Sequence, residues 1–379
     1  MMQPNPLKEI VNIGPPPGAP YSRAVKAGGL IYLSGMLAED GSGTIAGIGD
    51  VAAQTRRILE RVREVLSAAG SSLEQALSVT VYLKSASDFQ AMNDAYRPLW
   101  PKDPPTRTTV ITDLVLEEAL VEITVVAAPA GAERVVIHPD GWMQSPNPYN
   151  YAIRSGDTLF LSGLVSRNGR DNSVVTGDIT VQTRAVMDNA SELLKAAGLS
   201  FAHVVSTRVY LTDAANFQGM NEVYRHSFSH GFPARATVKA GLAGPVPLVE
   251  MTFTASSTRR EVFGTPPEGV PISPAIRAGE RLYLSGALGN TPETSGNAGA
   301  QTRETLARLR NTLASAGASP ADVVEGTVYL KEVAAFAAMN EQYRAFFGSG
   351  FPARTTVGTP LVVDDGLVEI MLTAVVPPA

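Results

Sequence analysis

Three stretches of the chain repeat one another: MNDAYRPLWPKDPPTRTTV at 92–110, MNEVYRHSFSHGFPARATV at 220–238 and MNEQYRAFFGSGFPARTTV at 339–357. Each contains an asparagine, a tyrosine three residues later and an arginine near its end. Other landmarks surround each stretch in the same order: a Ser-Gly pair after an apolar run, then Gln-Thr-Arg, Val-Tyr-Leu and Val-Glu. The sequence therefore contains three copies of one unit.

The spacing of these landmarks is nearly constant. From the glutamine of Gln-Thr-Arg it is 28 residues to the next landmark tyrosine, then 14 to the second, 11 to the arginine and 15 to the glutamate, in every copy. Copies one and two are offset by 128 residues, whereas copy three is offset by 123 up to Ser-Gly and by 119 from Gln-Thr-Arg onward. A unit that repeats at offsets of 119–128 residues has the size of a domain, not of a solenoid repeat. We predict three homologous domains, at 1–129, 130–256 and 257–379.

The elements within a copy alternate in type. In the first copy, LIYL (30–33) and ALSVTVYL (76–83) are typical of strands. Apolar residues recur with helical spacing over 51–69, just before Gly70, and 89–100 forms a second, shorter helix. RTTV and LVEITVVAA close the unit as strands, and KEIVNI, RVVIH and REVFG are short strand-like pieces at the domain starts. This order predicts α+β domains with both helices on one face of a mixed sheet. The sister domains are expected to cover the other face.

The composition excludes several classes of protein. There are 379 residues with a net charge of -5, and there is no cysteine, so disulfides and thiol nucleophiles are excluded. The acidic balance argues against a nucleic-acid partner, and no apolar run is long enough to cross a membrane. The start, MMQPNPLKEI, has no apolar region of the signal-peptide type. We therefore expect a cytoplasmic protein. We expect no cofactor and no metal, because only His226 and His230 have a spacing typical of metal ligands and no third ligand accompanies them.

The motifs GAPYSRAVKAGGLIYLSG, VAAQTRRILERVREVL, N-x-x-Y, FPAR-T-T-V and LVEI resemble those of the Rid family of reactive-intermediate (imine and enamine) deaminases, also called YjgF-like. The resemblance covers essentially the whole chain, three times. It implies ferredoxin-like, chorismate-mutase-like domains that form trimers with a ligand cleft at each subunit interface. This chain would then be a whole trimer in one polypeptide, a monomer with internal pseudo-threefold symmetry.

The arginine of each copy has two readings. A charged side chain at the start of a strand is costly to bury without a partner, and its planar fork suits a carboxylate. That carboxylate can come from the glutamate of the same copy, across neighbouring antiparallel strands, or from a ligand. The family resemblance favours the ligand, because the matching family residue binds the substrate carboxylate. The arginines are Arg107, Arg235 and Arg354.

The glutamates alternate with apolar residues, so they point away from the apolar face of the strand. The resemblance implies that each holds the attacking water, and partial burial would bring its pKa toward the working pH. Pairing with a nearby arginine is the alternative, and the two roles are compatible. These candidate catalytic residues are Glu122, Glu250 and Glu369.

The remaining candidates bind substrate if the resemblance holds. Glycine in the Ser-Gly turns permits a close approach of the backbone, although turn geometry alone would also explain it. The other candidates are threonines after the arginine, asparagines on the second helix and tyrosines that close the cleft. They are Ser34, Gly35, Ser162, Gly163, Ser285, Gly286, Thr109, Thr237, Thr356, Asn93, Asn221, Asn340, Tyr21 and Tyr149.

The three sites are not expected to be equal. Copy three has Ile272 in place of the tyrosine and has lost four residues after Ser-Gly, and copy one has PPTR instead of FPAR. We expect arginine and glutamate to come from one domain and tyrosine from its neighbour, so one cleft should lack its tyrosine. Fewer than three working clefts would fit these differences.

The predicted function is hydrolysis of 2-imino acids, or their enamine tautomers, to 2-oxo acids and ammonia. A small carboxylate-bearing substrate is the expected partner. One alternative is a ribonuclease or translation inhibitor, as described for some relatives, which the acidic composition disfavours. The other is a non-catalytic binder of small carboxylates, which would need the arginines but not the glutamates.

Overall fold

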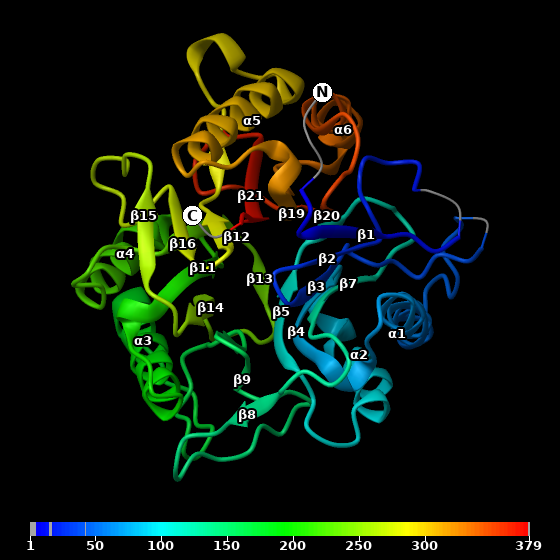
Figure 1. Ribbon diagram of the computed structural model, residues 1–379. Helices are drawn as coiled ribbons and strands as arrows, with labels where there is room; N and C mark the ends of the chain where they lie inside the picture. The colour runs from blue at the N-terminus through cyan, green and yellow to red at the C-terminus, as the bar shows by residue number, and fades with distance from the viewer. Residues whose placement is uncertain (1–4, 15–16, 42, 378–379) are drawn as a thin grey trace.

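The computed structural model describes residues 5–14, 17–41 and 43–377. Residues 1–4, part of the start considered above for a signal peptide, lie outside these ranges. Three groups of elements surround a common centre, with their strands inward and their helices outward (Figure 1). Each group has two α-helices and a mixed sheet, which confirms the predicted α+β class.

The longer elements recur in the same order in the three domains, whereas the third has an extra short strand, β18, and no strand equivalent to β6 or β13. The first contains β1 (Lys8–Val11), β2 (Ala24–Ala27), β3 (Leu30–Leu33), α1 (Val51–Ala68), β4 (Ala76–Leu83), α2 (Phe89–Tyr96), β5 (Thr106–Ile111), β6 (Asp113–Leu114) and β7 (Val121–Ala127). The second contains β8 (Val135–Ile137), β9 (Ala152–Ser155), β10 (Thr158–Leu161), α3 (Ile179–Ala196), β11 (Val204–Leu211), α4 (Phe217–His226), β12 (Ala234–Lys239), β13 (Gly241–Leu242) and β14 (Val249–Ser256). The third contains β15 (Arg260–Phe263), β16 (Ala275–Ala278), β17 (Arg281–Leu284), β18 (Ala287–Leu288), α5 (Ala298–Ser315), β19 (Val323–Leu330), α6 (Phe336–Phe347), β20 (Ala353–Gly358) and β21 (Val368–Val375).

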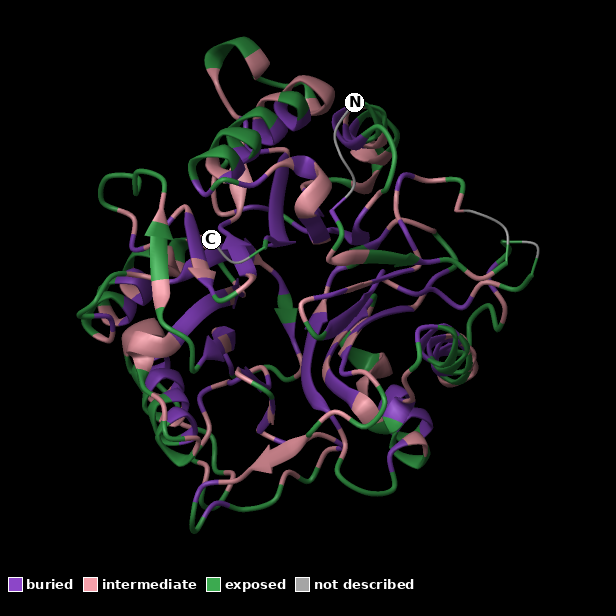
Figure 2. Cartoon of the chain, viewed as in Figure 1, coloured by how far each residue is buried: buried purple, intermediate pink, exposed green. Residues whose placement is uncertain are grey.

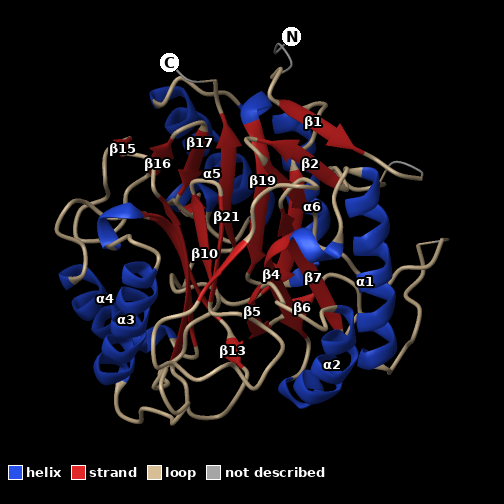
Figure 3. Ribbon diagram, turned by 60° about the horizontal axis from the view of Figure 1, so that its bottom comes forward, coloured by secondary structure: helices blue, strands red, loops and turns tan. Residues whose placement is uncertain are grey.

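The long helix of each domain forms where the sequence pattern predicts it. In α1 the Asp50 carboxylate accepts a hydrogen bond from the backbone N–H of Ala53, which caps the N-terminus. The helix ends at Ala68, and Gly70 follows with a φ of 75°, a conformation that glycine adopts without steric cost. Its apolar stripe is buried against the sheet (Figure 2). The helices thus lie on the outside of the molecule (Figure 3). None of the helices in the described ranges is long and apolar enough to cross a membrane.

The sheet of the first domain has the strand order β1-β2-β3-β7-β4-β5. Only β4 and β5 pair in parallel, with α2 in the crossover between them; the other pairs are antiparallel. Sequence reasoning did not predict β2, β9 or β16, the hairpin partners of the Ser-Gly strands. Each has only four residues, too few for the alternation of apolar and polar residues to be recognised.

Short segments join the domains in a cycle. β13 of the second domain pairs with β5 of the first, and β6 of the first pairs with β20 of the third. Leu361 of the third forms a bridge with Val238 of β12 in the second. In each case the strand that carries the arginine gains a partner from a neighbouring domain.

The sheet faces opposite the helices meet in several buried clusters, and we call the one that contains the landmark tyrosines of all three domains the central cluster. Tyr82, Tyr210 and Tyr329, one from each copy, are its largest members. Two domain junctions pair threonine hydroxyls: Thr108 with Thr252 at 2.7 Å, and Thr124 with Thr355 at 2.6 Å. The third junction places Ala236 and Met371 at the corresponding positions, so an apolar contact replaces the polar one.

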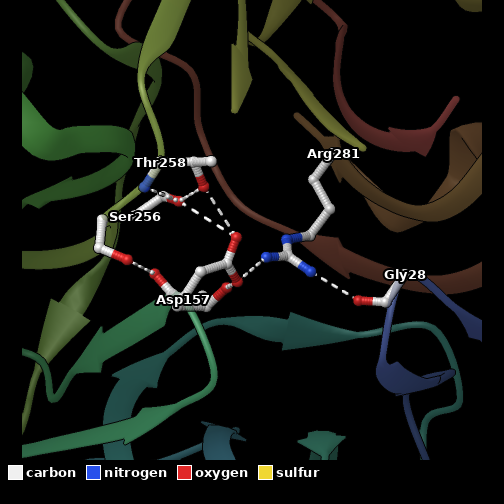
Figure 4. Close-up of polar contacts among 7 residues, drawn as sticks. Gly28, Asp157, Ser256, Thr258 and Arg281 are labelled. Carbon is white, nitrogen blue, oxygen red and sulfur yellow. Dashed lines mark hydrogen bonds and ion pairs between the residues drawn. The ribbon is translucent and has the colours of Figure 1, made fainter. Parts of the chain in front are cut away.

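Arg281 joins all three domains through one ion pair and one hydrogen bond, and the other two copies have no equivalent contact. Arg281 of the third domain binds Asp157 of the second and donates to the carbonyl of Gly28 of the first (Figure 4). Asp157 also accepts a hydrogen bond of 2.8 Å from Thr258. The positions that correspond to Arg281 hold Leu30 and Thr158, so this contact distinguishes the three domains from one another.

Candidate active site

A cleft lies between the third and first domains, with a cavity of about 210 Å³, and we call it the 3/1 cleft. The third domain contributes Arg354 and Thr356, from β20. The first domain contributes Tyr21, Gly35 and Glu122. The site therefore needs both domains.

An equivalent cleft of about 240 Å³, the 1/2 cleft, lies between the first and second domains. Arg107 and Thr109 come from β5 of the first domain. Tyr149, Gly163 and Glu250 come from the second. At the junction of the second and third domains, Arg235 and Glu369 are near enough to affect each other's pKa.

The grouping of these residues differs from the expectation. Glutamate and tyrosine come from one domain and arginine from its neighbour, whereas arginine and glutamate had been expected to share a domain. The reason is the strand order, because β4 lies between β5 and β7. Arg107 is in register with Val79 of β4, and Glu122 with Tyr82 on its other side. A pair across neighbouring antiparallel strands of one domain is therefore not formed.

Each arginine is buried, with 3% to 5% of its surface exposed, among aromatic rings. The Cζ atom of Arg107 lies 5.0 Å from the ring centre of Tyr96 and 5.8 Å from that of Phe89. Within the described ranges, none of the three arginines has a carboxylate within ion-pair distance, and Nη1 of Arg107 and of Arg235 has no hydrogen-bond partner. Burial lowers the pKa of all three arginines, and nearby tyrosines raise it in part. An uncompensated buried cation of this kind favours an anionic ligand.

In the third domain the asparagine of the second helix holds the arginine. Nη1 of Arg354 donates to Oδ1 of Asn340 at 2.7 Å. In the first domain, Nδ2 of Asn93 donates to Asn147 of the second domain, at 3.4 Å, and its Oδ1 has no partner within the described ranges. Asn93 and Asn221 are buried next to Tyr96 and Tyr224 on their helices. These positions favour a supporting role beside the guanidinium.

The three glutamates are all buried and face an arginine, but only Glu122 also has a nearby carboxylate, Glu39, which raises its pKa further. Burial raises the pKa of Glu122, Glu250 and Glu369 to about 8, although the facing arginine lowers it in part. Hydrogen bonds from the backbone of Thr109 to Glu250 and of Thr237 to Glu369 act in the same direction as the arginines. A carboxyl group with a pKa near neutrality can both accept and donate a proton at physiological pH.

The Ser-Gly turns join the domains at the site. Oγ of Ser162 accepts a hydrogen bond from the backbone N–H of Arg107 at 2.9 Å, and the N–H of Gly163 donates to the Arg107 carbonyl at 3.0 Å. The same two bonds link Ser34-Gly35 to Arg354 and Ser285-Gly286 to Arg235. Each serine hydroxyl also donates to a backbone carbonyl of its own domain. The serines therefore fix the arginine strand against the neighbouring domain.

The glycine of each turn leaves room for the glutamate. A Cβ atom added to Gly163 would lie 1.8 Å from Oε1 of Glu250, and the same holds for Gly35 and Glu122. At Gly286 the distance to Oε1 of Glu369 would be 2.0 Å. Only glycine allows the carboxylate to rest against this turn.

The tyrosines divide the sites into two kinds. Tyr21 lies 5.8 Å from Cζ of Arg354, and Tyr149 lies 5.6 Å from Cζ of Arg107. Among the described residues Arg235 contacts the rings of Phe217 and Tyr224, and Ile272 stands at the third position in sequence. Sequence reasoning missed the phenylalanines and tyrosines of the second helix as neighbours of the arginine. Their equal spacing in the three copies was the available signal.

With the site described, the chain can be compared with known proteins. The model of the Endoribonuclease L-PSP family matches it three times in tandem, at residues 13–129, 142–257 and 266–376. The chain belongs to this family, with three family domains in one polypeptide.

Among similar curated proteins, 3-aminoacrylate deaminase RutC of Acinetobacter baylyi is 41% identical over 113 residues, which is 30% of this chain and 90% of that protein. A RutC family protein of Sulfurisphaera tokodaii is also 41% identical, over 109 residues, 29% of this chain and 87% of the relative. Among solved structures, a chorismatase is similar with a TM-score of 0.54 over 79% of this chain and 93% of that one. At 17% identity this last likeness concerns the fold alone.

Proposed function

We propose that this protein hydrolyses 2-imino acids, or their 2-enamine tautomers, to 2-oxo acids and ammonia in the clefts between its domains. One observation carries the proposal: a buried arginine without an ion pair faces a buried glutamate of the next domain across a cavity. The name of the Acinetobacter relative, a deaminase of 3-aminoacrylate, supports the same class of reaction.

The arginine would bind the substrate carboxylate. Its guanidinium offers a planar pair of N–H donors, and the stacked rings keep it in one orientation. Binding a carboxylate there would compensate the buried positive charge. It would also place the adjacent C=N carbon near the glutamate, and such positioning accounts for much of the rate in this type of catalysis.

The glutamate would act as the proton acceptor and donor. Glu122 lines the 3/1 cavity, and its Oε2 has no hydrogen-bond partner among the described residues, so the carboxyl group would hold a water molecule there. Water attacks the carbon of the protonated imine, the iminium C=NH2⁺, and loses a proton to the carboxylate, which gives a neutral carbinolamine. The carboxylic acid then returns that proton to the amino nitrogen. As the C–N bond breaks, the hydroxyl proton passes to the carboxylate, and ammonia leaves with the 2-oxo acid. The reaction consumes one water and needs no oxidant.

The raised pKa suits this cycle. In the free protein at neutral pH the glutamate is largely protonated, since burial raises its pKa to about 8. The positive charge of a bound iminium would lower that pKa and convert the group into the base that the attack needs. We propose that the 3/1 and 1/2 clefts, which have a tyrosine, carry most of the activity, and that a monomer suffices.

The proposal is tested by trapping imines. An amino-acid oxidase generates 2-imino acids, semicarbazide traps them, and an active deaminase competes with the trap. Wild-type protein is expected to suppress trapping, and the triple variant Arg107→Ala, Arg235→Ala, Arg354→Ala is expected to lose this effect by a factor of about 100 or more, because the buried charge–carboxylate bond is absent.

The repeat provides a matched control for this experiment. Arg56, Arg184 and Arg303 are exposed, one in each copy, and their triple alanine variant should suppress trapping like the wild type. If wild-type protein leaves trapping unchanged with imines of several amino acids, the deaminase proposal is wrong. Arginine variants that retain full suppression would show that the clefts are not the site.

The Ser-Gly turns lead to a second expected result. In the triple variant Gly35→Ala, Gly163→Ala, Gly286→Ala, each new methyl group must displace its glutamate, since the present distances would be 1.8–2.0 Å. We expect imine hydrolysis to fall about 100-fold, as displacements of about 1 Å can cause. Gly41→Ala, where a Cβ meets no atom within 4 Å, is the control. Normal rates in the triple variant would show that the glutamate position is not critical.

A further inference from the structure

The 3/1 and 1/2 clefts differ in charge at one shared position. Five residues after the serine of Ser-Gly, the first copy has Glu39 and the second has Arg167. Both residues form equivalent strand bridges, Glu39 with Ile45 and Arg167 with Val174. Glu39 lines the 3/1 cleft and Arg167 lines the 1/2 cleft. The same wall of the two cavities therefore carries opposite charges.

Arg167 is held in place by its own loop. Its Nη1 donates to the carbonyl of Asn172 at 2.9 Å, and its own carbonyl accepts a hydrogen bond from Asn189 of α3. The lining of the 1/2 cleft contains two cations, Arg107 and Arg167, and a single acid, Glu250. Glu250 is the proposed proton carrier, and burial keeps it largely neutral at pH 7 by raising its pKa to about 8.

In the 3/1 cleft a protein carboxylate already occupies this wall. Oε2 of Glu39 lies 3.1 Å from Nη2 of Arg61, which also donates to the carbonyl of Leu37. Arg23 lines the cleft as well, so the difference between the clefts concerns the shared position and not the total charge. Arg61 lines this cleft too. At the shared position a second carboxylate on a ligand would therefore meet a carboxylate that is already paired with a cation in this cleft, and Arg167 in the other.

We propose that Arg167 makes the 1/2 cleft selective for 2-imino acids with a second, distal carboxylate, whereas the 3/1 cleft has Glu39, paired with Arg61, at the same position. Arg107 would bind the carboxylate next to the imine and Arg167 the distal one. The inference rests on the proposed function and adds the substrate class of one cleft. Because the three copies are separate parts of one chain, the residue at this position can differ from one cleft to the next.

The test uses a protein in which the 1/2 cleft works alone, the double variant Arg235→Ala, Arg354→Ala. Two substrates are compared by kcat/KM: the five-carbon dicarboxylic 2-imino acid formed from glutamate, and the neutral 2-imino acid formed from leucine. Adding Arg167→Ala is expected to lower the dicarboxylate-to-neutral ratio about tenfold or more, because a charge-assisted hydrogen bond is lost. Arg167→Lys should restore part of the ratio.

Two further variants complete the comparison. Arg170, an exposed residue of the same loop that pairs with Glu192 at 3.4 Å, serves as the control, and Arg170→Ala should leave the ratio unchanged. In a protein with only the 3/1 cleft, Arg107→Ala plus Arg235→Ala, the change Glu39→Arg should raise the ratio.

The outcomes separate this inference from the proposed function. If the neutral imine is hydrolysed and Arg167→Ala does not alter the ratio, the selectivity inference is wrong and the deaminase proposal stands. If the double variant hydrolyses neither imine although the wild type does, the 1/2 cleft is inactive and the inference is also wrong. If the wild type hydrolyses neither, the proposed function fails and the inference fails with it.

Discussion

The triple variant Glu122→Gln, Glu250→Gln, Glu369→Gln is expected to lower kcat/KM for imine hydrolysis by about 10²–10⁴-fold, the usual contribution of general acid–base catalysis. Glutamine keeps the shape and the hydrogen-bonding capacity of a protonated glutamate but cannot exchange the proton. Each glutamate is at most 5% exposed, so a base from the solvent cannot easily take its place. Competition with semicarbazide gives the rates.

Binding should survive the same change. The arginines and their aromatic neighbours are untouched, so titration calorimetry with a 2-oxo acid should give a Kd within about threefold of that of the wild type. Asp94, Glu222 and Glu341 occupy equivalent exposed helix positions, and their triple amide variant is the control. Full activity without the three site glutamates would remove their catalytic role. Binding without turnover even in the wild type would favour a carboxylate-binding protein instead.

The second large effect concerns stability and pH. The folded-state pKa of each glutamate is about 8, above the ordinary value of 4.5, so the folded protein holds more protons than the unfolded chain between these values. The free energy of unfolding must therefore fall as pH rises through this window, by up to about 1.4 kcal/mol per pH unit for each glutamate. Below pH 4.5 the contribution is complete, and above about 8 it is lost.

Urea unfolding at several pH values measures this effect. The difference between wild type and the triple glutamine variant isolates the three glutamates, because all other titrating groups are common to both proteins. The variant should match the wild type below about pH 4, where the glutamates are protonated in both the folded and the unfolded protein, and should be more stable above pH 8. Parallel curves over pH 5–8 would show that the glutamates titrate near 4.5 and are not desolvated as the fold indicates.

Much of this site could be predicted from the sequence because the chain contains its own comparison. Arg107, Arg235 and Arg354 stand out because each lies 15 residues before a glutamate (Glu122, Glu250 and Glu369) in copies that differ elsewhere. The opposite charges at Glu39 and Arg167 were visible in the same comparison. Without the cavity, however, nothing distinguished them from other surface charges.

By itself the sequence determined the three domains, their helices and their longer strands, and the residues that recur, since helical periodicity, strand alternation and spacing are local properties. Only the tertiary structure decided which residues share a cleft. β4 separates β5 from β7 within each sheet, so Arg107 meets Glu250 of the next domain and not Glu122 of its own. The tertiary structure also showed that Ser162 joins two domains, because its hydroxyl accepts a hydrogen bond from the backbone of Arg107. Such pairings depend on contacts between residues far apart in the chain, and no local pattern encodes them.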